Sequence, residues 1–306
     1  MANQEFRIYR ATAREADDAL RFYASGGTGN PPSDTALDEI REAIRKGTWK
    51  SNHQILARRG PELIGSTPFF ISPSRTAVIA FPSTAPTETH ETAAKLVKAA
   101  AHAAAHEGAK LCIALIPHSF PHGGIPFLSS GFRRIAVLAN MELHSLPSES
   151  PDQNLQWITY DKSTCRRFED TFAATLQGTL DCPSLPRVQT PSEVLEGHKL
   201  AGEFQPNLWL LALEENHEIG CVLSNQLRKP AHFCLIYLGV VPDHRGKRYG
   251  EVLMRRAMSE AKKRGATKIS LSVDEQNRPA LKTYERLGFR RTNRTVLYAL
   301  SIAAAQ

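Results

Sequence analysis

The chain has 306 residues, 42% of them hydrophobic and 23% charged, which is the composition of a folded globular protein and excludes a disordered or fibrous one. No stretch approaches the ~20 consecutive apolar residues of a membrane helix, so we expect no membrane partner. The net charge of +7 is uneven, because residues 235–295 hold 15 Lys and Arg against 6 Asp and Glu. Such a concentration attracts anions, such as a phosphorylated cofactor or a nucleic acid.

The N-terminal residues 1–7 are polar and carry no secretory signal, which predicts a cytoplasmic protein. The five cysteines are odd in number and have no metal-ligand spacing, so neither a disulfide framework nor a cysteine zinc site is expected. His102 and His106 lie four residues apart on a predicted helix, but no third ligand accompanies them. We therefore expect no metal.

The predicted elements run in the same order through both halves of the chain. First strands are expected at residues 6–10 and 156–160, each before a helical segment. Further strands are expected at residues 54–58 and 208–213, each before a turn. The polar segment 145–154, which contains two prolines, separates the halves as a linker. We predict two similar domains, at residues 1–146 and 153–306.

The later parts of the two halves have similar sequences, which align without gaps at an offset of 157 residues. Gly131-Phe132-Arg133-Arg134 recurs as Gly288-Phe289-Arg290-Arg291, and Gly108-Ala109 recurs as Gly265-Ala266. Each copy has the pattern strand, helix, strand, helix, strand. In the second copy these elements are predicted at residues 235–240, 249–264, 268–273, 279–287 and 295–300.

A basic, glycine-containing turn at residues 242–250 joins the first of these strands to the first helix. Amides at a helix start lack intrahelical partners and lie at the positive end of the helix dipole, so they hold phosphate groups well. Arg245, Lys247 and Arg248 add positive charge. The alternative is a basic turn that only caps an ordinary helix.

The second copy resembles the GCN5-related N-acetyltransferase family. The motifs that carry the resemblance are Val240-Val241-Pro242, Arg245 and Gly250, followed by Asn277, Ala280, Tyr284 and Gly288-Phe289. The similarity is strong over residues 210–300 and weak over 153–210. It implies a mixed α/β fold built from two tandem domains of this family.

The resemblance implies acetyl-CoA, or another acyl-CoA, as cosubstrate. The turn amides would cradle its pyrophosphate, the pantetheine arm would follow the strand, and Asn277 would lie near the pantetheine. The implied cofactor-binding residues are Leu238, Val240, Arg245, Gly246, Lys247, Arg248, Tyr249, Gly250 and Asn277. Tyr284 would act as the general acid that protonates the leaving thiolate after direct attack by an acceptor amine. The alternative for Tyr284 is a packing residue on an amphipathic helix.

One residue departs from the family pattern, because Arg248 stands where the family has its middle glycine. Arginine suits this position if the backbone is right-handed and suits it poorly if φ is positive. The general base is not identified: His232, Asp181 and Glu214 are candidates, each with a surface or structural role as the alternative. Asp181 also lies in the segment expected to form the acceptor pocket, where it could bind a cationic amine.

The first copy has lost these residues. Arg245 corresponds to Glu88, Arg248 to Glu91, and Tyr284 to Phe127. The remaining replacements are Thr89 for Gly246, Ala93 for Gly250 and Phe120 for Asn277. Carboxylates would repel a pyrophosphate and phenylalanine has no proton to donate, so we expect a degenerate domain without cofactor.

The leading hypothesis is therefore an N-acetyltransferase acting on a small-molecule or peptide amine. An acyl-CoA-binding sensor or scaffold without turnover is the alternative, which a thiol-release assay distinguishes. A nucleic-acid binder is disfavoured, because no aromatic and basic interleaving or DNA-reading motif is present and a CoA site accounts for much of the charge.

Overall fold

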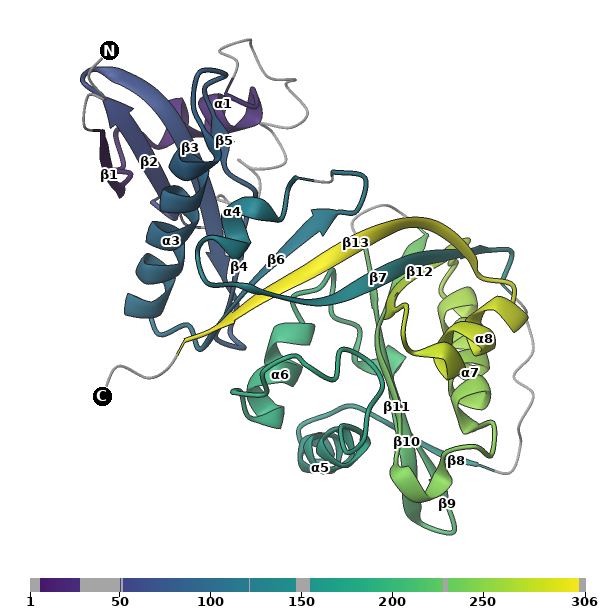
Figure 1. Ribbon diagram of the computed structural model, residues 1–306. Coiled ribbons are helices and arrows are strands. Elements are labelled where there is room, and N and C mark those ends of the chain that lie inside the picture. The colour runs from purple at the N-terminus through teal and green to yellow at the C-terminus, as the bar shows by residue number, and fades with distance from the viewer. Residues whose placement is uncertain are drawn as a thin grey trace. The chain divides into compact units, whose positions relative to one another are not determined.

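The computed structural model describes residues 6–27, 50, 52–120, 122–146, 155–227 and 231–302. The chain forms two compact units (Figure 1): unit 1 comprises Met1–Ile135 and Val296–Gln306, and unit 2 comprises Ala136–Thr295. Most of the predicted linker lies outside the described residues. All elements below are those of the described residues.

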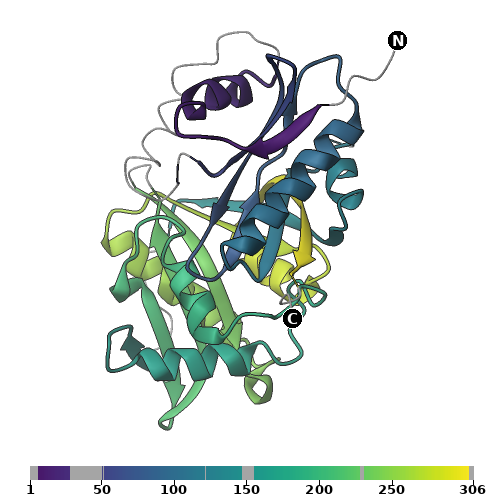
Figure 2. The same cartoon turned by 90° about the vertical axis from the view of Figure 1, so that its left-hand side faces the viewer.

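Unit 1 is a sheet with helices on both faces. Its neighbouring strands are, in order, β1 (Arg7–Arg10), β2 (Gln54–Arg59), β3 (Glu62–Ile71), β4 (Thr76–Ile79), β6 (Leu111–Pro117) and the final part of β13 (Arg290–Ser301), with β5 (Ser83–Thr84) paired to β3. The helices are α1 (Ala16–Ala24), α3 (His90–His106) and α4 (Ile125–Leu128). Leu96 and Val97 of α3 pack with Ile55 and Ala57 of β2, whereas Ala19 of α1 packs with Leu56. Successive strand residues therefore face opposite helices. Figure 2 shows α1, in purple, and α3, in blue, on opposite sides of the strands of this unit.

Unit 2 repeats this architecture. Its strand order is β7 (Arg133–His144), β12 (Lys268–Asp274), β11 (His232–Val240), β10 (His217–Gln226), β9 (Trp209–Glu214) and β8 (Gln156–Thr159). Its helices are α5 (Cys165–Thr175), α6 (Pro191–His198), α7 (Tyr249–Lys263) and α8 (Arg278–Arg286), with short 3-10 turns η1 (Pro206–Leu208) and η2 (Pro242–His244). Strands β11 and β12 are parallel, whereas β10 and β11 are antiparallel, so the predicted mixed α/β fold is confirmed.

The two faces of this sheet bury different side chains. Leu210 and Ala212 of β9 belong to the core beneath α7 and α8. Trp209 and Leu211 alternate with them and belong to the core beneath α5 and α6. The functional groups described below therefore stand on a sheet that is buried from both sides.

The predicted offset of 157 residues recurs in the bounds of two pairs of strands. The bounds of β6 and β12 differ by the same 157 residues as those of β7 and β13. The compact units nevertheless differ from the two halves of the sequence. Residues of β7 from Leu138 to His144 pair with β12 inside unit 2, and the end of β13 lies in unit 1, where the Ile302 amide donates to the Lys110 carbonyl at 2.9 Å. A fragment of residues 153–306 would consequently lack a strand of unit 2.

Candidate active site

Strand β11 separates from its parallel neighbour partway along its length. Its first residues pair with β12 as far as Cys234 opposite Ser270, and no register continues beyond them among the described residues. On its other side β11 stays paired with β10 up to Val240 opposite Gly220, with an irregularity between Leu223 and Ser224. Residues 235–240 therefore present one edge to which an extended ligand can add like a further strand.

The turn after β11 leads into α7 with several amides available. Among the described residues, no group accepts a hydrogen bond from the backbone amides of Gly246, Lys247, Arg248 or Gly250. These amides stand at the N-terminus of α7, where the helix dipole is positive. Lys247 and Arg248 are exposed and form no ion pair within the described ranges, so their charges are free to act on an anion. Turns with this geometry suit phosphate groups, as the sequence predicts for this one.

Arg248 adopts the conformation that the family's glycine would supply. Its φ is 66° and its ψ is 10°, which is left-handed, and Gly246 has a φ of 79°. A left-handed conformation costs an L-residue about 1–2 kcal/mol. The turn thus keeps a glycine-like path and carries a guanidinium group at its surface.

Arg245 has a different role from the one expected of a charge in this turn. Its Nε donates to the carbonyl of Val240 at 3.0 Å, and its terminal nitrogens donate to the carbonyls of Gly178 at 3.1 Å and Thr175 at 2.9 Å. The guanidinium therefore ties the end of β11 to the end of α5. Through these bonds the phosphate-binding turn is connected to the segment that follows α5.

The remaining predicted cofactor residues lie around the same turn. Leu238 and Val240 pack partly buried against the core beneath α7. The Tyr249 hydroxyl donates to Glu214 at 2.6 Å, and the Tyr249 ring lies 5.7 Å from that of His244. Glu214, one of the candidate bases, is therefore engaged with the turn.

A second set of polar groups gathers where β12 ends and α8 begins. Asp274 is only 2% exposed; its Oδ2 accepts from the Cys182 amide at 3.2 Å, and its Oδ1 accepts from the Gln276 amide at 2.9 Å. The Asp274 amide in turn donates to Asp181 Oδ1 at 3.0 Å. Asn277 caps α8 by accepting from the Ala280 amide at 3.3 Å, and its side chain lies close enough to Asp181 to lower the pKa of that carboxyl. The structure thus brings Asp181 and Asn277 together.

Asp181 is accessible to solvent, yet protein surrounds its carboxylate. Desolvation, together with the negative charge of Asp274, raises the pKa of Asp181 above its ordinary value, against the opposing hydrogen bond from the Asp274 amide. A carboxylate with a raised pKa is a better proton acceptor than an ordinary surface aspartate.

Tyr284 combines burial with an unpaired hydroxyl. The residue is 7% exposed, its ring packs 5.8 Å from that of Phe289, and its hydroxyl has no hydrogen-bond partner in the described part of the chain. Burial, and then the nearby Asp181 and Tyr237, raise the pKa of Tyr284, so the phenol is protonated at neutral pH. Tyr237 differs because its hydroxyl lies 2.7 Å from Thr175 Oγ1.

The cysteines of this region are poor nucleophiles. Burial raises the pKa of Cys182 and of Cys221 to about 12, so neither carries a thiolate near neutral pH. These thiols are therefore unsuited to act as nucleophiles at neutral pH.

One candidate base lies away from the other groups, and two residues near them were not predicted. His232 begins β11, at the opposite end from the turn, and its Nε2 lies 3.0 Å from Ser270 Oγ, so it does not join the other groups. Asp274 and Tyr237 were not predicted. The position of Asp274 at the end of a predicted strand, beside Asn277, is the pattern that indicates it.

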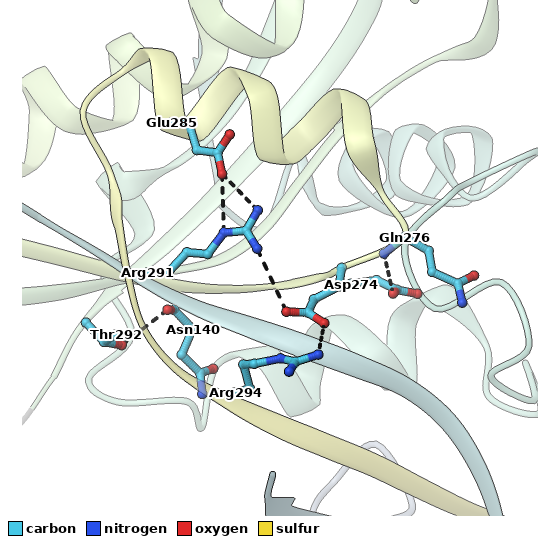
Figure 3. A network of polar contacts seen from close by, with 8 residues as sticks. Asn140, Asp274, Gln276, Glu285, Arg291, Thr292 and Arg294 are labelled. Atoms are coloured by element: carbon cyan, nitrogen blue, oxygen red, sulfur yellow. Dashed lines mark hydrogen bonds and ion pairs between the residues drawn. The ribbon is translucent and has the colours of Figure 1, made fainter. Parts of the chain in front are cut away.

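A network of polar contacts fixes this end of β12 (Figure 3). Glu275 pairs with Arg294 and, at 3.9 Å, with Arg291, which also pairs with Glu285 of α8 at 2.8 Å. Thr292 donates to the backbone carbonyl of Asn140 at 3.2 Å. These contacts connect Glu275, just before α8, and Glu285, in its last turn, to the final strand β13.

In the first copy the corresponding space is filled. Phe81 and Phe120, at the positions of Leu238 and Asn277, pack edge to face with centroids 4.9 Å apart, and Phe127 is completely buried. Glu88 pairs with Arg59 at 2.7 Å and accepts from Thr92 at 2.8 Å, so its carboxylate is turned inward. Apolar rings therefore occupy the part of unit 1 where unit 2 has its open strand edge.

Over the described ranges, no group of three metal-binding side chains comes together. In the same ranges, no helix is long and apolar enough to cross a membrane.

Comparison with known proteins gives one family match and several relatives. Residues 176–289 match the Acetyltransferase (GNAT) family. Over 50 residues, the chain is 50% identical to the streptothricin acetyltransferase of Streptomyces lavendulae, a match covering 16% of this chain and 26% of that protein. The chain therefore spans about a quarter of that relative's length.

Solved structures match over nearly the whole chain. A GCN5-related N-acetyltransferase from Sphaerobacter thermophilus superposes with a TM-score of 0.65 at 17% identity, covering 97% of this chain and 95% of that one. A tandem GNAT protein from the clavulanic acid biosynthesis pathway superposes with a TM-score of 0.56 at 13% identity, covering 99% and 100%. At these identities the likeness concerns the fold.

Proposed function

We propose that this chain, whose residues 176–289 match the Acetyltransferase (GNAT) family, belongs to that family, that it transfers an acetyl group from acetyl-CoA to an amine, and that unit 2 carries the reaction. The observation that supports this most is the open edge of β11 next to the unpaired amides of the following turn. One feature suits an extended pantetheine chain and the other suits a pyrophosphate.

In this proposal the amides of residues 246–250 and the charges of Lys247 and Arg248 bind the pyrophosphate. The pantetheine arm follows Leu238 and Val240. Arg245 contributes by holding the turn, since its guanidinium is bound to three backbone carbonyls. Asn277 positions the start of α8 beside the thioester.

The reaction is a direct transfer. The neutral amine attacks the thioester carbonyl, the C–N bond forms, and collapse of the tetrahedral intermediate breaks the C–S bond. Tyr284 gives its phenolic proton to the departing CoA sulfur and recovers one from the nitrogen. Its unpaired hydroxyl is available for this step, and its raised pKa keeps it protonated beforehand.

Unit 1 is proposed to bind no cofactor, because Phe81 and Phe120 fill the equivalent space. Its half of the sequence still serves unit 2, since residues of β7 pair with the whole length of β12. We propose that this strand supports the position of Asp274 and the groups beyond it.

The test is a screen of amines with acetyl-CoA, followed by free-thiol release, on the full chain and on Tyr284→Phe. Phe127 occupies the equivalent core position in unit 1, so the substitution should preserve packing. We expect single-turnover rates to fall about 10²-fold or more with little change in CoA affinity. Tyr160→Phe, which removes a phenol bonded to Lys199, is the matched control. A rate within threefold of wild type would leave Tyr284 as a packing residue, and CoA binding without thiol release from any amine would favour the sensor.

A further inference from the structure

We propose that Asp181 receives the ammonium group of the acceptor and takes its proton, which makes Asp181 a catalytic residue and restricts acceptors to amines that bind as cations. This inference rests on the proposed function of unit 2. It adds to that function a base and a recognition site for the acceptor.

The carboxylate is held in a fixed position by the end of β12. Asp181 Oδ1 accepts from the Asp274 amide at 3.0 Å, and the Cys182 amide next to it donates back to Asp274 Oδ2 at 3.2 Å. Cys182 has a φ of 46°, which is a left-handed conformation. With this backbone conformation, Asp181 and Cys182, which are successive in the chain, both contact Asp274. These two reciprocal hydrogen bonds hold the Asp181 carboxylate in one position, unlike a freely rotating surface side chain.

An independent observation indicates a ligand at this point. The Tyr284 hydroxyl, on a residue more than nine-tenths buried, has no partner among the described residues, and Asp181 lies close enough for its charge to act on the phenol. Because the protein provides this hydroxyl with no partner, it is available to a bound molecule. A proton acceptor and a proton donor thus lie in the same region of unit 2.

The surroundings of Asp181 suit a cation. The charged and titratable groups that act on it or lie around it are Asp274 of β12, Arg187 and Cys182 of its own segment, Tyr237 of β11 and Tyr284 of α8. Two carboxylates against one guanidinium leave a negative balance, which attracts an ammonium group. Alcohols and thiols gain nothing from this charge, so they should be poor acceptors.

The charges of acid and base are coupled. The negative charge of Asp181 contributes to raising the pKa of Tyr284. When Asp181 has taken a proton from the ammonium group, that contribution disappears and Tyr284 becomes a stronger acid, at the stage when the thiolate leaves. The amine loses two protons in total: one passes through Asp181 to solvent, and the other ends on the CoA sulfur through Tyr284.

The coupling sets the direction of the pH dependence. Asp181 must be ionised to accept the proton, so activity falls as the pH drops through its raised pKa. Asp181→Asn removes this acid limb. Asp181→Glu keeps a carboxylate and should restore part of the activity.

The experiment uses the full chain loaded with CoA and the probes propylamine, 1,3-diaminopropane and glucosamine, with propanol, 1,3-propanediol and glucose as uncharged counterparts. Ligand-detected NMR measures binding, and thiol release from acetyl-CoA measures turnover. Asp170→Asn is the matched control, because Asp170 is an exposed aspartate of α5 paired with Arg166 at 3.2 Å.

We expect at least one amine to bind to wild type and to Asp170→Asn but not to Asp181→Asn, with CoA affinity equal in all three. Turnover in Asp181→Asn should fall about 100-fold, with loss of the acid limb. Equal amine binding in Asp181→Asn, an unchanged pH profile, or no amine binding to the CoA-loaded wild type would overturn the inference. Failure to bind CoA at all, or amine binding without thiol release, would instead overturn the proposed function.

Discussion

Replacing Arg248 by glycine separates the backbone of the phosphate-binding turn from its charge. The left-handed conformation of Arg248, with a φ of 66°, costs about 1–2 kcal/mol, and glycine removes this cost. Glycine also loses about 0.5–1 kcal/mol more conformational entropy on folding. The net gain is about 0–1.5 kcal/mol, which corresponds to a rise in Tm of up to about 6 °C for a unit of this size.

The affinity for CoA should change in the opposite direction. Because Arg248 is exposed, unpaired within the described ranges and next to available amides, Arg248→Gly removes a charge that we propose contacts the pyrophosphate. We expect Kd for CoA, measured by calorimetry, to rise about three- to tenfold, an effect that weakens at high salt.

Arg248→Ala is the matched control for this experiment, because it removes the same charge but keeps a side chain in the left-handed conformation. Its Kd should equal that of Arg248→Gly, while its Tm should remain near that of wild type. Tighter CoA binding by Arg248→Gly than by wild type would refute the reasoning, since it would show that the side chain obstructs the turn.

Two further variants test other parts of the structure. Arg245→Glu removes three hydrogen bonds to the carbonyls of Thr175, Gly178 and Val240. We therefore expect the affinity for CoA to fall at least about tenfold, which is about 1.4 kcal/mol, and the Tm to fall as well. A loss of affinity at an unchanged Tm would show that Arg245 acts by its charge alone. In unit 1, Arg59 holds the pKa of Glu88 below its usual value of 4.5, so the ionised carboxylate stabilises the fold at neutral pH and this contribution is lost as the pH falls through the lowered pKa. The stability difference between wild type and Glu88→Gln, followed by denaturant unfolding, should therefore narrow below about pH 4.5, and a constant difference would contradict the pairing.

Local patterns predicted the elements well. The helix from Tyr249 and the strand from Lys268 were expected from apolar spacing and from stop residues such as Gly265, and the structure begins both at these residues. The repeat offset carried the same assignments to the first half. These features depend on residues that are neighbours in sequence.

The features that the sequence did not reveal depend on contacts between distant residues. The last strand of each half of the sequence, β7 or β13, contributes to the other unit. Their local sequences do not indicate this exchange, because a strand has the same residue pattern whichever sheet it joins. The interaction of Arg245 with Thr175 spans 70 residues, and that of Asp181 with Asp274 spans 93. The sequence showed basic and acidic residues in these segments, but only the fold determines which groups they contact.

The central claim is that the chain binds one acetyl-CoA, in the turn of unit 2. Calorimetric titration of CoA into the full chain tests this without an acceptor. We predict one site per chain, abolished or severely weakened by the double variant Lys247→Glu with Arg248→Glu and unchanged by Glu91→Gln, an exposed carboxylate at the matching position of unit 1. Two sites per chain, no binding, or unchanged binding by the double variant would contradict the account.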